Sequence, residues 1–284
     1  MSESIALGRR ARGGGGPAVG RRRHWRGRGR GRLDNCLVMS ARCTRLSSRN
    51  IEALITSLML PVALMLMFVY LFGGAIDTGT TYVTYVVPGV ILLCAGFGSA
   101  TTAVTVSQDM TGGIVDRLRS LDVGGAAVLG GHVAASLARN AASTVLVLGV
   151  ALLIGFHPTA GPLAWLGVIG ILALFVISIS ALSAAIGLLA GSPEAANGFT
   201  FFVMFLPYAS SAFVPVSTMP SWLQGFARHQ PITPVIETLR SLLVGGSAGS
   251  DPWQAVAWCV AILVGSVGLA GVAFTRRTTQ SSSA

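Results

Sequence analysis

The chain contains no lysine, so all twenty of its basic residues are arginines. A Walker A phosphate-binding loop requires a lysine, which excludes a P-loop ATPase built from this chain alone. The four cysteines, at positions 36, 43, 94 and 259, show no C-x-x-C spacing, which argues against a zinc site or a disulfide framework. We therefore expect no catalytic site, no metal site and no cofactor of the chain's own.

Charged residues are also scarce, at 11% of the chain against 52% hydrophobic residues. Soluble domains carry roughly 25% charged residues. The apolar residues form unbroken runs rather than the alternating pattern of barrel strands, and six runs are long enough to cross a bilayer as helices. This pattern predicts an all-α, polytopic membrane protein with one membrane domain, residues 46–277. The six predicted spans are residues 53–73, 83–107, 134–155, 163–190, 199–216 and 253–274.

None of these spans contains Asp or Glu. Proton- or sodium-coupled carriers usually place ionisable groups near the middle of the membrane, so their absence argues against such a carrier. Arg139 is expected near the cytoplasmic end of span three, where its side chain can reach the headgroups. Span five contains two interrupting prolines, and a turn is expected before it over residues 191–198.

The excess positive charge is confined to the N-terminus, because residues 1–49 hold thirteen arginines against Glu3 and Asp34. Residues 1–45 are predicted to be a disordered, Arg/Gly-rich cytoplasmic tail. Residues 278–284, which are rich in Ser and Thr, are predicted to be a short cytoplasmic tail. The long tail could lie on anionic lipid headgroups or precede a start at Met39. Nucleic acid is not an expected partner, because one tryptophan among the arginines is poor evidence for base stacking.

Six spans place both termini on one side of the membrane. The arginine-rich N-terminus, the loop between spans two and three, and Arg276 and Arg277 all fall on that side, which the positive-inside rule makes cytoplasmic. Arg228 and Arg240 on the other side are a minority. Arginine without lysine, in a chain rich in alanine and glycine, suggests a GC-rich bacterial genome, so the expected location is a bacterial plasma membrane.

An island of charge separates spans two and three. Residues 108–123 hold five charged residues, whereas Asp77 is the only charged residue between positions 53 and 107. Two interpretations stay open: a helix resting on lipid headgroups, and a docking helix held by a water-soluble partner. If the segment is helical, one apolar stripe is formed by Met110, Ile114, Leu118 and Leu121.

The longest inter-span segment, residues 217–251, is expected on the outer side. Thr233 is predicted to be a helix N-cap with Pro234 at the first helical position, and Gly245 and Gly246 are predicted to end that helix. The segment is interpreted as a re-entrant or amphipathic surface helix, with Trp222 as an interfacial anchor.

Small residues and one proline in spans two and five allow helices to pack closely. They could serve packing within the chain, or they could line a dimer interface or a transport pathway. These positions are Gly89, Gly96, Ser99 and Pro207.

The charged segment DMTGGIVDRLRSLDV, residues 109–123, resembles the cytoplasmic loop of ABC-2-type transporter permeases, in particular the daunorubicin/doxorubicin-resistance type. Those loops carry Asp, a glycine a few residues on, and then Asp-Arg-x-Arg-Ser-Leu-Pro. The sequence departs from this pattern at Asp122, where the family usually has proline. The matching positions are Asp109, Gly113, Asp116, Arg117, Arg119, Ser120 and Leu121.

Two further segments carry the resemblance. Residues 219–246, MPSWLQGFARHQPITPVIETLRSLLVGG, are similar to the outer segment of these permeases, and FVYLFGGAI in span one is a weaker match. Together the three segments extend the resemblance over roughly residues 46–277. The outer segment has the expected residues at Pro231, Thr233, Arg240 and Gly245.

The resemblance implies the membrane-spanning permease subunit of an ATP-binding-cassette exporter. The implied partners are an ATPase subunit that binds ATP on a separate chain, a second permease copy or paralogue, membrane lipid, and a hydrophobic or amphiphilic substrate. Two alternatives stay open: a secondary carrier, and a membrane scaffold that recruits a soluble protein through residues 108–123. The implied ATPase-docking residues are Asp109, Gly113, Ile114, Asp116, Arg117, Leu118, Arg119 and Leu121.

Overall fold

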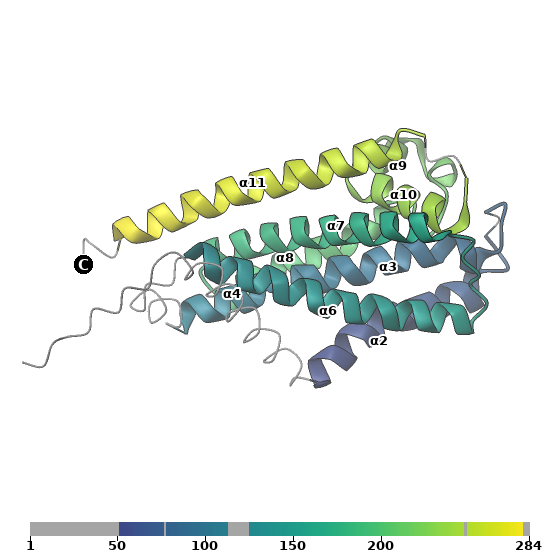
Figure 1. The fold of residues 1–284 in the computed structure, drawn as a ribbon. Helices are drawn as coiled ribbons and strands as arrows, with labels where there is room; N and C mark the ends of the chain where they lie inside the picture. The colour runs from purple at the N-terminus through teal and green to yellow at the C-terminus, as the bar shows by residue number, and fades with distance from the viewer. Residues whose placement is uncertain (1–50, 77, 113–124, 247–248, 281–284) are drawn as a thin grey trace, which may run out of the picture.

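The computed structural model describes residues 51–76, 78–112, 125–246 and 249–280, and every long regular element in those ranges is a helix (Figure 1). The all-α prediction is confirmed for this part of the chain. The elements are α2 (Ile51–Met67), the π-helix η1 (Phe68–Phe72), α3 (Tyr82–Ala100), α4 (Thr102–Thr111), α6 (Gly125–Leu153), α7 (Pro162–Leu189), α8 (Pro193–Phe205), the 3₁₀ helices η2 (Leu206–Ala209) and η3 (Val216–Thr218), α9 (Ser221–His229), α10 (Ile232–Val244) and α11 (Asp251–Gln280).

Four of the described helical segments are long and apolar enough to cross a membrane. They are Tyr82–Thr111, Val128–Leu153, Pro162–Leu189 and Asp251–Ala273, and they correspond to the predicted spans two, three, four and six. The first predicted span lies in α2 and η1, where Met59–Phe72 forms a shorter apolar helix. Crossings by this segment and by predicted span five stay predictions.

The helix at predicted span five, α8, begins before residue 199 and ends before residue 216, the predicted bounds. Ser192 caps α8 by accepting a hydrogen bond from the Ala195 amide at 3.2 Å, and Pro193 occupies the first turn. A break between helices is therefore present at residues 190–192, but the predicted turn is wrong for residues 193–198, which are helical because the cap and the proline start α8 at Pro193. The α-helix ends at Phe205, next to Pro207, and its 13 residues cover about 20 Å, less than a bilayer core.

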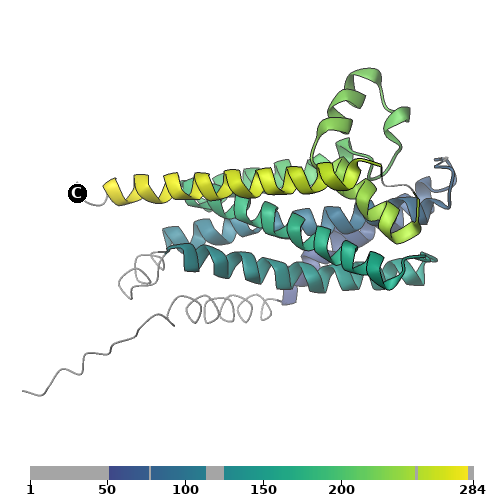
Figure 2. The same cartoon turned by 45° about the horizontal axis from the view of Figure 1, so that its top comes forward.

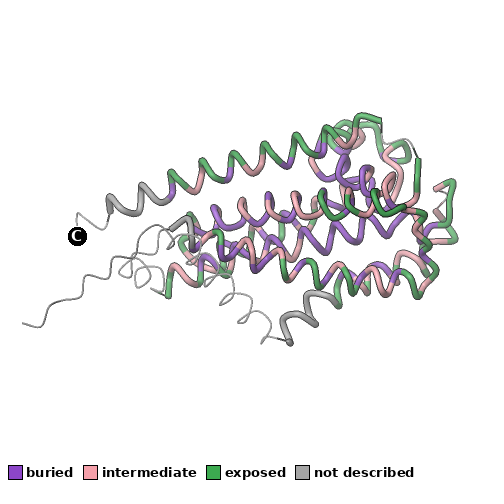
Figure 3. Tube along the Cα trace, in the orientation of Figure 1, coloured by how far each residue is buried: buried purple, intermediate pink, exposed green. Residues whose placement is uncertain are grey.

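The central helix of the bundle is α3, which packs against α2, α6, α7, α8 and α10. Figure 3 shows α3 almost entirely buried, whereas α11 is exposed along most of its length. α11 lies along α7 at the edge of the bundle. Its outward residues are apolar, with Val264 67% and Val267 64% exposed, as expected for a helix face in contact with lipid acyl chains.

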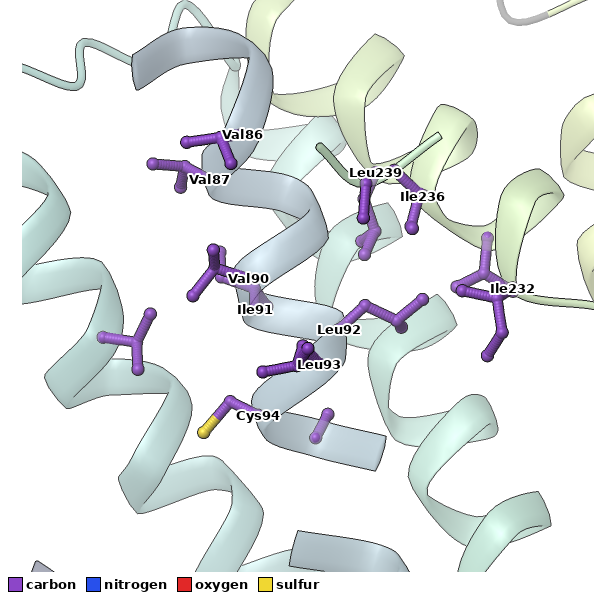
Figure 4. Packing of buried hydrophobic residues seen from close by; sticks show 14 of the residues in the cluster. Val86, Val87, Val90, Ile91, Leu92, Leu93, Cys94, Ile232, Ile236 and Leu239 are labelled. Carbon is purple, nitrogen blue, oxygen red and sulfur yellow. The ribbon is translucent and has the colours of Figure 1, made fainter. Parts of the chain in front are cut away.

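The end of the bundle at which α3 begins is covered by α10. Ile236 and Leu239 of α10 lie on the side of α3 that carries Leu92 (Figure 4), and all three side chains are fully buried. The segment that contains α9 projects from one side of the bundle (Figure 2). We refer below to this end, where α3, α7, α10 and α11 all begin, as the outer end, after the predicted outer segment, residues 217–251, of which α10 is part.

The predicted N-cap of α10, Thr233, is wrong. Pro231 precedes the helix with helical backbone angles, φ −65° and ψ −24°, and the first helical residue is Ile232. Thr233 therefore lies inside the first turn, and its buried hydroxyl does not cap the helix. The predicted end is confirmed: Gly245 has φ +88°, a conformation that glycine adopts without strain.

Candidate functional site

Most of the predicted docking residues lie outside the described part of the chain; these are Gly113, Ile114, Asp116, Arg117, Leu118, Arg119 and Leu121. Asp109 is described, in the last turns of α4. Its Oδ2 lies 3.2 Å from Nε2 of His132 on α6, a contact that is ionic when the imidazole is protonated. The two helices that flank the charged segment are therefore in contact close to where that segment begins and ends.

α4 packs tightly against α7 along its length. Val106 joins a small hydrophobic cluster with Leu188 of α7 and Ala273 of α11, and Met110 packs against it. A Cβ added at Gly187 of α7 would lie 2.4 Å from the carbonyl oxygen of Ala103, so the two helix backbones touch. Met110, which the sequence places on the docking stripe, thus contacts the chain's own core.

A polar cluster inside the bundle joins α3, α6 and α7. Nδ2 of Asn140 donates to Ser99 Oγ at 3.3 Å and to Ser136 Oγ at 3.2 Å, and the Ser136 and Ser180 hydroxyls are 2.8 Å apart. All four residues are buried. Sequence reasoning missed the cluster, although the adjacent Arg139 and Asn140 in an otherwise apolar run mark its position.

The side chain of Arg139 does not lie where the sequence predicted it. It sits midway along α6, and its Nη2 donates to the carbonyl oxygen of Gly98 on α3 at 3.1 Å. The expectation of an anchor reaching toward the cytoplasmic headgroups is wrong, because α6 extends unbroken for 29 residues and carries Arg139 deeper into the bundle. A basic group at this depth is costly unless backbone carbonyls or polar side chains surround it.

The four positions predicted to line a pathway or a dimer interface are all buried within this one chain. Gly89 lies against Ala212, a Cβ on Gly96 would meet Phe175 at 3.9 Å, and Ser99 accepts from Asn140. Packing among the chain's own helices is enough to account for small residues at Gly89, Gly96 and Ser99. A role for these positions and for Pro207 in a pathway stays a prediction.

Arg240 joins three parts of the outer end. Its Nη2 donates to Ser211 O at 2.9 Å and Tyr85 O at 3.2 Å, and its Nη1 lies 2.6 Å from Glu237 Oε1. Its Cζ lies 3.8 Å from the centroid of the Tyr85 ring, within cation–π distance. The predicted outer residue Arg240 thus fixes α10 to α3 and to the segment after η2; Pro231 and Gly245 bound α10.

The fold therefore defines a polytopic helical membrane protein, with a charged segment between two of its long helices and a polar interior at mid-helix. A family model described as "ABC-2 type transporter" matches residues 34–244. The chain belongs to this family, and it is the membrane subunit of an ABC exporter.

Its curated relatives agree with this assignment. A protein of Streptomyces coeruleorubidus named "Daunorubicin resistance ABC transporter permease protein DrrB1" is 31% identical over 194 residues, which cover 68% of this chain and 69% of the relative. A protein of Mycobacterium tuberculosis named "Probable doxorubicin resistance ABC transporter permease protein DrrC" is 25% identical over 219 residues, 76% of this chain and 79% of the relative.

Proposed function

We propose that this subunit exports a hydrophobic or amphiphilic solute across a bacterial plasma membrane, driven by ATP hydrolysis in a separate ATPase chain. The observation that carries the proposal is the ABC-2 family match over residues 34–244, together with a charged segment set between α4 and α6. The names of the relatives refer to resistance to daunorubicin and doxorubicin. They support a drug-like substrate.

The ATPase is proposed to bind residues 108–123 as a docking helix. Its apolar side chains Ile114, Leu118 and Leu121 would fill a groove on the ATPase, because buried apolar anchors usually dominate an interface. Asp116, Arg117 and Arg119 would fix the orientation at the rim, where exposed ion pairs contribute little energy. The contact of Asp109 with His132 supports this by joining the helices on either side of the segment.

Six crossings with both termini in the cytoplasm are part of the proposal. The two remaining crossings would be α2 with η1, and predicted span five, residues 199–216, which include the second half of α8 and all of η2. Tyr70, Leu71 and Phe202 in these segments are 73%, 68% and 63% exposed. A second permease copy or paralogue would complete the exporter. The four tryptophans in the described residues all lie near the starts of α7, α9 and α11, where an aromatic belt at the outer membrane interface would place them.

Substitutions in the docking segment test the proposal. Leu118→Asp would bring an unpaired charge into the ATPase groove, at a large desolvation cost. We expect this variant to insert normally but to lose co-purification of the ATPase and ATP turnover in liposomes. Arg119→Ala, the matched control, should be milder because it removes only a rim contact. If Leu118→Asp retains the ATPase while Arg119→Ala loses it, the apolar stripe faces lipid instead.

A further inference from the structure

The helix of the second predicted span, Tyr82–Thr111, is irregular at one residue. α3 ends at Ala100 and α4 begins at Thr102, so the helix is interrupted at Thr101. The Thr101 amide still donates to Phe97 O at 3.2 Å, but its side-chain Oγ1 donates to Gly98 O at 2.8 Å. Neither proline nor a π-bulge lies at this position, but the pair Gly98-Ser99 does, and such pairs are also sites at which helices bend.

Side chains from two other helices donate to backbone carbonyls at the interruption. Arg139 of α6 donates to Gly98 O at 3.1 Å, and Thr200 of α8 donates through Oγ1 to Ala100 O at 3.2 Å. The carbonyl groups on either side of Ser99 thus have hydrogen-bond donors from outside their own helix. Within a membrane, backbone groups released from a helix must find such partners, and here α6 and α8 supply them.

The two halves of this span share the neighbours α6, α7 and α8, but only α3 also packs against α2 and α10. α3 lies chiefly against α6, α7 and α2, whereas α4 lies chiefly against α7 and α8. α4 also carries Asp109, which contacts His132, and it leads directly into the charged segment. A change in the angle at Thr101 would therefore move the docking segment relative to the core of the bundle.

We propose that the interruption at Thr101 is a hinge between the docking segment and the membrane core, and that Arg139 and Thr200 are the positioning residues that set its angle. The location of the hinge follows from the geometry alone. Its role in transport rests on the proposed ATPase docking. The pair Gly98-Ser99 marks its position in the sequence, but the donors that set its angle come from α6 and α8.

The angle can be measured on the full chain without any ATPase. Spin labels at Gln108 of α4 and Val145 of α6, both exposed, are introduced into a cysteine-free background, and the distance between them is measured by pulsed electron paramagnetic resonance in nanodiscs. We expect one narrow distribution for the parent protein. Arg139→Leu and Thr200→Val should broaden or shift it, because each removes one donor from the interruption.

Conservative variants separate positioning from general stability. Arg139→Lys and Thr200→Ser keep a donor and should restore the narrow distribution. The control is Ser178→Ala, which removes an equally buried hydroxyl that donates to Cys259 O at 2.8 Å between α7 and α11; it should leave the distance unchanged. The hinge is refuted if Arg139→Leu and Thr200→Val match the parent distribution, or if Ser178→Ala broadens it equally.

A measurement of drug efflux tests whether the hinge contributes to transport. In cells expressing the chain with its ATPase, daunorubicin efflux is the probe, compared at equal amounts of membrane-inserted protein. Arg139→Leu should reduce efflux and Arg139→Lys should recover part of it; unchanged efflux with a broadened distance would refute the role in transport. If the parent chain itself moves no daunorubicin, the proposed substrate class fails, while the distance measurement still decides the hinge.

Discussion

Gly89 of α3 and Ala212, in the segment between η2 and η3, are in backbone contact. A Cβ placed on Gly89 would lie 2.7 Å from both Cα and O of Ala212, closer than real Cβ contacts allow. The residues on either side of Ala212 accept hydrogen bonds from two tyrosines of α3, Phe213 O from Tyr82 Oη at 2.9 Å and Ser211 O from Tyr85 Oη at 3.0 Å. Residues 211–213 are therefore held in direct contact with α3 at the outer end.

Gly89→Ala should destabilise the protein, because the atoms it would meet belong to backbone that cannot rotate away. Overpacking of this kind costs about 1–3 kcal/mol, so we expect a lower melting temperature in detergent. Gly170→Ala is the control: Gly170 is also helical, and a Cβ there meets nothing within 4 Å. Equal melting temperatures for the two variants would mean that the segment around Ala212 adapts easily.

Arg240→Ala should also destabilise the outer end, since it leaves the carbonyl oxygens of Tyr85 and Ser211 without their guanidinium donor and removes the cation–π contact. Hydrogen bonds to charged groups contribute roughly 1.5–3 kcal/mol each, and the Arg240 side chain is only 15% exposed. We expect a loss on the order of 2–3 kcal/mol, measured as a drop in melting temperature.

Two variants make the Arg240 test specific. Arg240→Lys keeps the charge but lacks the planar fork that reaches two carbonyls and an acid together, so it should recover only part of the stability. Arg228→Ala removes an exposed arginine of α9 and should change little. A melting temperature for Arg240→Ala as high as that of Arg228→Ala would contradict the bridging role.

Sequence patterns predicted the long helices well, because a run of apolar residues that matches the bilayer leaves few alternatives. The boundaries of α7 agree with the prediction to within one residue at each end, Pro162–Leu189 against 163–190. Glycine also predicted the end of α10 correctly, since few other residues accept the positive φ of Gly245.

Features formed by several helices could not be predicted in the same way. The interruption at Thr101 depends on donors more than 35 positions away in the sequence, Arg139 and Thr200. The N-terminus of α8 was misplaced because Ser192 and Pro193 were interpreted as turn residues, although the same two residues are a cap and a first helical position. Residues 113–124 lie outside the described part of the chain, so the assignment of the docking segment to the ATPase rests on the sequence pattern.

Membrane orientation is predicted by the arginine distribution. A single cysteine at Arg228, exposed on α9, should react with an impermeant maleimide added to intact cells. A single cysteine at Gln108, exposed on α4, should react only after the membrane is opened. Labelling of both positions from the same side would contradict the six-span topology.

The arginine-rich tail is predicted to be dispensable for export. The family match begins at residue 34, and ten of the thirteen arginines of residues 1–49 lie before it. Deletion of residues 2–32 should therefore leave membrane insertion and efflux close to the level of the full chain, as measured by membrane fractionation and daunorubicin accumulation. Loss of insertion or of efflux would assign the tail a function.

The start of α8 should make stability depend on pH in the acidic range. The hydrogen bond from the Ser192 side chain, and then that from its own backbone amide, lower the pKa of the Glu194 carboxyl below its ordinary value. A carboxyl with a lowered folded-state pKa contributes stability above its unfolded pKa, near 4.3. That contribution is lost as the pH falls through the folded pKa.

Glu194→Gln should therefore melt below the parent protein at pH 7, and the difference should shrink as the pH falls below about 4. Ser192→Ala should cost more, about 1 kcal/mol, because it also removes the N-cap acceptor of the Ala195 amide. Its deficit should persist at low pH, where the cap still acts although the carboxyl is protonated. Melting temperatures of the three proteins across pH 3–7 check both statements, and a Glu194→Gln deficit that grows with acidification would reverse the assigned sign.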